Sequence, residues 1–146
     1  MNDFLSHGLR FGCTQCSRCC RHDPGYVFLS PADCSAIADF LGISCNELVA
    51  SRCRKVVLGG GLTMVSLLEK ENHDCTFWNN AEGCTVYEAR PVQCRTYPFW
   101  ASAVEDWESW NREAVHCPGI GQGRVYTRDE IEALLAMRRQ NHPMTV

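Results

Sequence analysis

Four cysteines fall within residues 13–20, in the pattern CxxCxxCC. Side chains this small and this closely spaced cannot build a hydrophobic core. A tight CxxC turn can, however, direct its two sulfurs toward one centre. Thiolates are soft donors that favour zinc, copper(I) or iron–sulfur clusters. The stretch therefore predicts a metal site, and we expect the rest of the chain to fold around it.

The adjacent pair Cys19 and Cys20 indicates more than one centre. Successive side chains of an extended backbone point in opposite directions, and a four-coordinate centre has no use for a fifth thiol. We expect Cys13, Cys16 and Cys19, which have the ferredoxin spacing, to form most of one centre. Cys20 then joins thiols from the distant half of the chain. The alternative is a single site with Cys20 beside it but not bound to the metal.

Eight of the eleven cysteines lie in turn-rich or proline-rich contexts that suit metal ligands. These predicted ligands are Cys13, Cys16, Cys19, Cys20, Cys75, Cys84, Cys94 and Cys117. Eight divides into two sets of four, the coordination number of structural zinc and of cubane iron–sulfur clusters. The other three, Cys34, Cys45 and Cys53, fall in a predicted helical hairpin. They are interpreted as small buried apolar residues.

The spacing favours iron–sulfur clusters over zinc. Zinc sites commonly combine two CxxC pairs or add histidine, whereas this chain has one CxxCxxC and scattered single thiols. Cys117-Pro118 also resembles the Cys-Pro step that ends the bacterial ferredoxin ligand run. We expect 4Fe–4S clusters, two in number, with zinc or iron ions as the alternative. A histidine ligand (His22, His73 or His116, each within two residues of a predicted ligand) would favour zinc or mononuclear iron.

Composition is that of an ordinary globular protein. The 146 residues are 45% hydrophobic and 21% charged, and we expect one α+β domain over residues 1–146. The formal net charge of −3 gives no electrostatic basis for binding nucleic acid or an anionic membrane. The start has no signal-peptide pattern, and no apolar run is long enough to span a membrane. We therefore expect a cytoplasmic location, where clustered thiols more often bind metals than form disulfides.

Short helices and hairpins, joined by irregular loops, are predicted around the cysteines. N-cap signatures predict helices over residues 31–41 and 45–54. Apolar runs on both sides of a triple glycine predict a β-hairpin over residues 56–68. A further capping box predicts a C-terminal helix over residues 128–140, and residues 141–146 are expected to fray.

The second cysteine-bearing region is predicted to contain a hairpin and a short helix. A turn and a brief strand near Cys84 would let Cys75 and Cys84 flank the hairpin and converge. Pro91 begins a short helix that carries Cys94, and Pro98 ends that helix. The many aromatic residues in this half are interpreted as core packing, because no basic surface accompanies them for stacking on nucleic-acid bases.

These motifs together resemble the YkgJ-type CxxCxxCC cysteine-cluster family. The resemblance covers roughly residues 9–120 and rests on residues 11–21, 83–87, 90–91, 94–99 and 117–119. It implies a zinc- or iron-chelating domain and supplies no substrate. A similar cysteine cluster occurs in the flagellin lysine methylase. Because this chain has no recognisable glycine-rich SAM-binding segment, a metal-dependent enzyme related to protein lysine methylation stays a minor alternative.

Three classes of function fit these features. A redox or electron-transfer protein would carry an iron–sulfur cluster that changes oxidation state, and we favour this class. A structural or iron-delivering module would hold zinc or iron. An enzyme would keep a metal coordination position open to water. Metal ions are the expected partners, together with a redox or other protein. The sequence assigns no catalytic residue, substrate, redox potential or oligomeric state.

Overall fold

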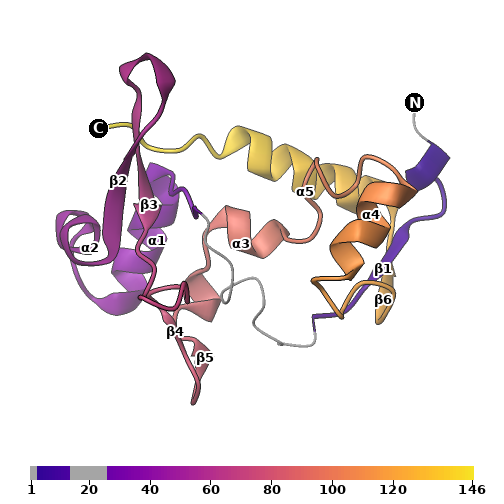
Figure 1. Cartoon of the computed structure of the whole chain (residues 1–146), viewed down its shortest axis with the longest axis horizontal. Helices are drawn as coiled ribbons and strands as arrows, with labels where there is room; N and C mark the ends of the chain where they lie inside the picture. Colours follow the sequence, from indigo (N-terminus) through magenta and orange to yellow (C-terminus); the bar gives the residue numbers. More distant parts are fainter. Residues whose placement is uncertain (1–2, 14–25) are drawn as a thin grey trace. The chain divides into compact units, whose positions relative to one another are not determined.

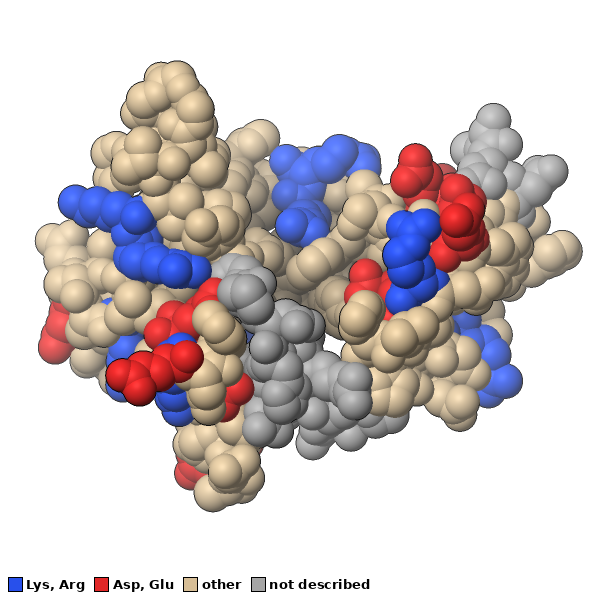
Figure 2. All heavy atoms as spheres, viewed as in Figure 1, with Lys and Arg blue, Asp and Glu red and all other residues tan. Residues whose placement is uncertain are grey.

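A computed structural model describes residues 3–13 and 26–146 as short helices and small antiparallel sheets (Figure 1). This mixture confirms the predicted α+β class. Within the described residues, no helix is long and apolar enough to cross a membrane. On the face that Figure 2 shows, Lys and Arg side chains are interspersed with Asp and Glu rather than gathered into one basic patch.

The chain divides into two compact units, each described here by itself. Unit 1 consists of Met1–Cys19 and Thr96–Gln140. Its elements are η1 (Asp3–Leu5), β1 (Leu9–Phe11), α4 (Trp107–Ala114), β6 (Arg124–Tyr126) and α5 (Arg128–Gln140). Strands β1 and β6 pair antiparallel, with Arg10 opposite Val125. The N-terminal segment is therefore paired with a strand more than a hundred residues later in the chain.

Phe99 lies at the centre of the unit 1 core and is only 2% exposed. Its ring centroid lies 5.7 Å from that of Phe11, 5.6 Å from Trp110 and 4.7 Å from Tyr126. Aromatic pairs at such separations pack favourably beyond the area they bury. The prediction that the aromatic residues of the second cysteine-bearing region form a core is confirmed for the buried Phe99 and Trp110, whereas Tyr87 and Trp107 are exposed.

Unit 2 consists of Cys20–Arg95 and Asn141–Val146. Its helical elements are α1 (Pro31–Leu41), α2 (Cys45–Arg52), η3 (Gly59–Gly61), η4 (Tyr87–Ala89) and the start of α3 (Val92–Thr96). Its strands are β2 (Cys53–Val57), β3 (Thr63–Leu67), β4 (Trp78–Asn79) and β5 (Gly83–Cys84). Strand β2 pairs with β3, and β4 pairs with β5, both antiparallel.

Helix α1 begins and ends where its sequence signals predict. The Ser30 side chain accepts the Asp33 N–H, and the Asp33 carboxylate accepts the Ser30 N–H, so the capping box is complete. Pro31 takes the first turn, and Gly42 ends the helix with φ at 71°, a conformation that favours glycine. Helix α2 also forms, but it ends at Arg52 rather than at residue 54 because the chain enters β2 there.

The predicted hairpin around the triple glycine is confirmed and is longer than expected. Lys55 of β2 lies opposite Val65 of β3. Gly60 and Gly61 have φ of 76° and 77°, so the turn uses the conformational freedom of glycine. On the other side of β3, the Leu29 N–H donates to the Val65 carbonyl at 3.1 Å.

The prediction that residues 141–146 fray is wrong. The Met144 N–H donates to the Leu29 carbonyl at 2.8 Å, and the Val146 N–H donates to the Thr63 carbonyl at 3.0 Å. In Figure 1 the C-terminus accordingly lies beside the β2–β3 hairpin. Backbone groups far away in the sequence fix this segment, and no local pattern in residues 141–146 predicts these hydrogen bonds.

Asp33 is a buried carboxylate, 4% exposed, that joins three segments of unit 2. Besides the Ser30 N–H, it accepts the Val92 N–H at 3.1 Å and the Asn141 Nδ2–H at 2.8 Å. A buried carboxylate is tolerated when hydrogen-bond donors replace its water. Asp33 therefore links the start of α1 to the start of α3 and to the C-terminal segment.

We predict that Asp33→Asn lowers the free energy of unfolding by about 2–4 kcal/mol, because an amide N–H then faces N–H donors in a buried site. Urea denaturation followed by circular dichroism measures the change. Asp39→Asn is the matched control, since Asp39 is an exposed residue of the same helix. Equal stability of the two variants would contradict the prediction.

Candidate metal centre

Five of the eight predicted ligands lie in the described residues. Cys13 and Cys117 belong to unit 1, whereas Cys75, Cys84 and Cys94 belong to unit 2. The remaining predicted ligands, Cys16, Cys19 and Cys20, lie outside the described residues.

In unit 1 the segments that carry Cys13 and Cys117 lie side by side. The Gly12 N–H donates to the Gly119 carbonyl at 3.0 Å, and Phe11 forms a β-bridge with Ile120. Cys13 directly follows one of these segments and Cys117 opens the other. Cys117 is 8% exposed and Cys13 is exposed, so one thiol lies in the protein interior and the other at its surface.

Three glycines permit this close approach. A Cβ on Gly119 would overlap the Gly12 carbonyl oxygen, and a Cβ on Gly123 would lie 2.8 Å from the Gly12 Cα. Real Cβ atoms essentially never approach that closely, so larger residues would force the two segments apart. The glycines next to the cysteine motifs were therefore a usable sequence signal, which the prediction of the metal site did not use.

In unit 2, Cys75 and Cys84 flank the β4–β5 hairpin, as predicted. Trp78 of β4 is the register partner of Cys84, and its N–H donates to the Cys75 carbonyl at 2.9 Å. Both cysteines are half-buried and pack against the hydrophobic cluster of unit 2. The backbone thus brings two ligands that are nine residues apart in the sequence to the same small hairpin.

Cys94 lies in α3, as predicted. Its N–H donates to the Pro91 carbonyl at 2.9 Å in the first turn, and the helix ends at Thr96, two residues before Pro98. Cys94 is half-buried. The helix begins where Asp33 accepts the Val92 N–H, so the buried carboxylate fixes the turn that carries this thiol.

Within residues 3–13 and 26–146, no group of three or more His, Cys, Asp or Glu side chains is arranged to hold a metal ion. Convergence of the eight cysteines therefore stays a prediction. Unit 1 contributes two predicted ligands from its described part, and unit 2 contributes three. A four-thiolate centre in either unit would need sulfurs from the CxxCxxCC stretch.

The three cysteines outside the predicted ligand set differ from one another. Cys34 is a core residue, 1% exposed, and burial raises its pKa to about 11, with smaller contributions from Cys45 and Asp33. Burial likewise raises the pKa of Cys53 to about 12, and the charge of Cys34 adds to the effect. At neutral pH both thiols hold their protons, which makes them poor metal ligands.

The interpretation of this trio as buried helical residues needs two corrections. Cys45 is exposed, as the first residue of α2, with its Sγ 3.8 Å from the Ser35 Oγ. Cys53 is half-buried and begins β2 instead of lying in the helix. The helical pattern placed Cys45 in the helical hairpin correctly, but it does not tell which side of a two-helix pair is covered.

Of the two histidines in the described part near predicted ligands, His73 has another side-chain partner. His73 Nδ1 lies 3.1 Å from Glu69 Oε2, whereas the bond from His116 to the Glu113 carbonyl, at 2.9 Å, is made by its backbone N–H. Both histidines are exposed. His22 lies outside the described residues.

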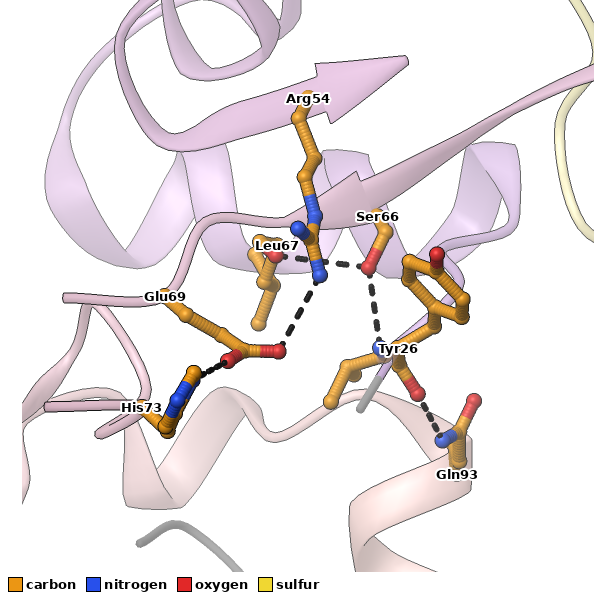
Figure 3. Close-up of polar contacts among 8 residues, drawn as sticks. Tyr26, Arg54, Ser66, Leu67, Glu69, His73 and Gln93 are labelled. Atoms are coloured by element: carbon orange, nitrogen blue, oxygen red, sulfur yellow. Dashed lines mark hydrogen bonds and ion pairs between the residues drawn. The ribbon is translucent and has the colours of Figure 1, made fainter. Parts of the chain in front are cut away.

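Figure 3 shows a polar network in unit 2 that the sequence did not predict. Arg54 Nη2 lies 3.1 Å from Glu69 Oε1, and the same carboxylate holds His73. The Arg54 guanidinium also lies 4.8 Å from the centre of the Tyr26 ring. Gln93 Nε2–H donates to the Tyr26 carbonyl at 2.7 Å. The network thus joins four separate segments of the chain.

The CxxCxxCC family model, described as "Putative zinc- or iron-chelating domain", matches residues 12–118. The chain belongs to this family. The matched range begins one residue before Cys13 and ends one residue after Cys117, so it contains all eight predicted ligands. No solved structure matches the chain. Membership confirms the resemblance noted in the sequence and supports zinc or iron binding.

The donor set fits that family assignment. The five described ligands are all cysteines, and thiolate sulfur suits zinc, iron and iron–sulfur clusters alike. The glycine contact in unit 1 and the hairpin in unit 2 each hold two of these thiol-bearing segments together through backbone contacts.

Gly119→Ala is predicted to lower stability by about 1–3 kcal/mol, because the added methyl group overlaps the Gly12 carbonyl and pushes the Cys13 and Cys117 segments apart. Thermal denaturation of the metal-free protein measures this change. The matched control is Gly59→Ala, since a Cβ at Gly59 meets no atom within 4 Å. If the two variants melted alike, the glycine contact would not be a tight constraint.

Proposed function

We propose that the protein binds two metal centres, each with four cysteine thiolates, and that iron–sulfur clusters occupy them in an electron-transfer role. The observation that carries the proposal is the division of the described ligands, two in unit 1 and three in unit 2. Four-coordinate centres then require two more thiols for the first and one more for the second. Besides Cys13, which is already counted in unit 1, the CxxCxxCC stretch offers three thiols: Cys16, Cys19 and Cys20.

This count supports a specific assignment of the eight thiols. The first centre takes Cys13, Cys16, Cys19 and Cys117, and the second takes Cys20, Cys75, Cys84 and Cys94. The assignment separates Cys19 from Cys20, as their adjacency in the sequence requires. It also keeps the ferredoxin-like CxxCxxC spacing within one centre.

An iron–sulfur cluster would supply one-electron redox chemistry, whereas zinc would supply structure alone. The protein's own contribution is to present thiols and to limit water around them. Cys117 is buried, and the Phe11 ring lies against Gly119 beside it. Low exposure and apolar surroundings are among the factors that set the reduction potential of such clusters.

The second candidate is a structural zinc-binding or iron-chelating module, which the family description favours because it names zinc and iron. The minor alternative is a metal-dependent enzyme related to lysine methylation. A full set of four thiolates leaves no open position for substrate, so our assignment disfavours it. We further propose that residues 1–146 act as one cysteine-cluster domain in the cytoplasm, with a redox protein as partner.

Protein purified without oxygen decides the nature of the metal. We expect a brown protein with about four iron and four acid-labile sulfide per centre, and a visible absorption that bleaches on reduction. Metal analysis, sulfide assay and absorption spectra measure these quantities. A colourless protein with zinc and no sulfide would overturn the cluster proposal and establish the zinc alternative.

Cys20→Ser tests the division into two centres. We expect it to remove one centre and to leave the spectrum of the other intact, because only the second centre uses Cys20. Metal content and electron paramagnetic resonance of the reduced protein provide the measurement. Cys45→Ser is the control, since Cys45 is an exposed thiol outside the ligand set. Unchanged metal content in Cys20→Ser would contradict the two-centre model.

Removing the metal is expected to loosen the loops between residues 75 and 94 before α5, because these loops contain little regular structure of their own. Hydrogen exchange read by mass spectrometry compares loaded and chelated protein peptide by peptide. The predicted result is faster exchange in that segment and similar exchange in α5. Identical protection with and without metal would show that packing alone holds the loops.

A further inference from the structure

The polar network of unit 2 is built on segments that adjoin two predicted ligands of the second centre, Cys75 and Cys94 (Figure 3). Tyr26 is the first described residue after the CxxCxxCC stretch, Glu69 belongs to the segment that pairs with Cys75, and Gln93 directly precedes Cys94. Arg54, on β2, connects the first two of these segments. Glu69 and Gln93 therefore lie next to ligand-bearing pieces of backbone, and Arg54 joins Glu69 to Tyr26.

Gln93 binds the Tyr26 segment through both ends of its side-chain amide. Nε2–H donates to the Tyr26 carbonyl at 2.7 Å, and Oε1 accepts the Phe28 N–H at 3.2 Å. The side chain thus pairs with an extended backbone as a neighbouring strand would. Since Gln93 and Cys94 are consecutive in α3, these two bonds set the position of the helix turn that carries the thiol.

The other end of the same segment is held by β2 and β3. The Val27 N–H donates to Ser66 Oγ at 3.0 Å, and the Arg54 guanidinium lies over the Tyr26 ring. Arg54 in turn binds Glu69, whose side chain is only 16% exposed. Glu69 forms a β-bridge with Cys75, so the ion pair reaches the backbone of a second predicted ligand.

We propose that Gln93 and the Arg54–Glu69 pair are positioning residues that hold Cys94 and Cys75 in place before the metal binds. This inference rests on the proposed second centre. Ligands that are fixed in advance lose less conformational freedom on coordination, so metal affinity depends on the groups that fix them. Residues that orient metal ligands typically change affinity 10–100-fold when replaced.

Two substitutions at Gln93 distinguish the loss of one hydrogen bond from the loss of both. Gln93→Glu keeps the size of the side chain and an acceptor for the Phe28 N–H, but it sets a carboxylate oxygen against the Tyr26 carbonyl. Gln93→Leu removes both bonds.

Glu69→Gln keeps the shape of Glu69 and removes the charge that binds Arg54. Gln140→Glu, at the exposed end of α5, is the control for the added charge.

The measurement is Zn²⁺ affinity by competition with a chelator, made in a Cys117→Ser background so that only the second centre is complete. The expected result is a 10–100-fold loss of affinity in Gln93→Glu, Gln93→Leu and Glu69→Gln, and none in Gln140→Glu. Titrations are run well below the melting temperature of each metal-free variant. A purely structural role would lower that melting temperature and leave the affinity of the folded protein unchanged.

Each result decides between stated possibilities. Unchanged Zn²⁺ affinity in all three variants, with the protein folded, overturns the positioning role and leaves the second centre standing. Failure of the parent Cys117→Ser protein to bind Zn²⁺ at all refutes the proposed second centre itself. If Gln93→Leu does not fold, Gln93→Glu and Glu69→Gln decide the matter, since both preserve side-chain volume.

Discussion

Thiolates that share one metal repel each other until the cation binds, and the chain loses conformational freedom in bringing them together. The described structure meets this constraint with backbone contacts made next to the cysteines rather than at them. In unit 1 the Gly12–Gly119 contact aligns the segments of two thiols, and in unit 2 the β4–β5 hairpin does the same.

The raised pKa of two cysteines argues against their serving as metal ligands. Burial raises the pKa of Cys34 and of Cys53 and so keeps the proton on each sulfur. A protonated thiol offers a metal little affinity. The chain can therefore carry Cys34 and Cys53 near its predicted ligands without forming competing sites from them.

Local signals in the sequence predicted the local structure well. The capping boxes at Ser30 and Thr127, and the triple glycine of the hairpin, depend on neighbouring residues, and all three formed as expected. The errors concern contacts between distant residues. The C-terminal segment is fixed by Leu29 and Thr63, and the Gln93–Tyr26 bond spans 67 residues. Neither contact leaves a periodic pattern in the sequence. The ligand set itself was predicted from the spacing of the cysteines and their turn-rich or proline-rich context, which do not show which contacts hold the thiols.

The contacts that hold the ligand segments affect how much of the free energy of metal binding orders the chain and how much remains as affinity. Where a zinc-binding peptide is unfolded without metal, most of that free energy orders the chain. Here Asp33, Gln93 and the Arg54–Glu69 pair already fix the start of α3 and the segment paired with Cys75. Fewer residues remain to be ordered on coordination, so more of the gross metal–thiolate interaction is retained as affinity. On the positioning proposal, the polar contacts of unit 2 therefore contribute to how tightly its predicted ligands would hold a metal.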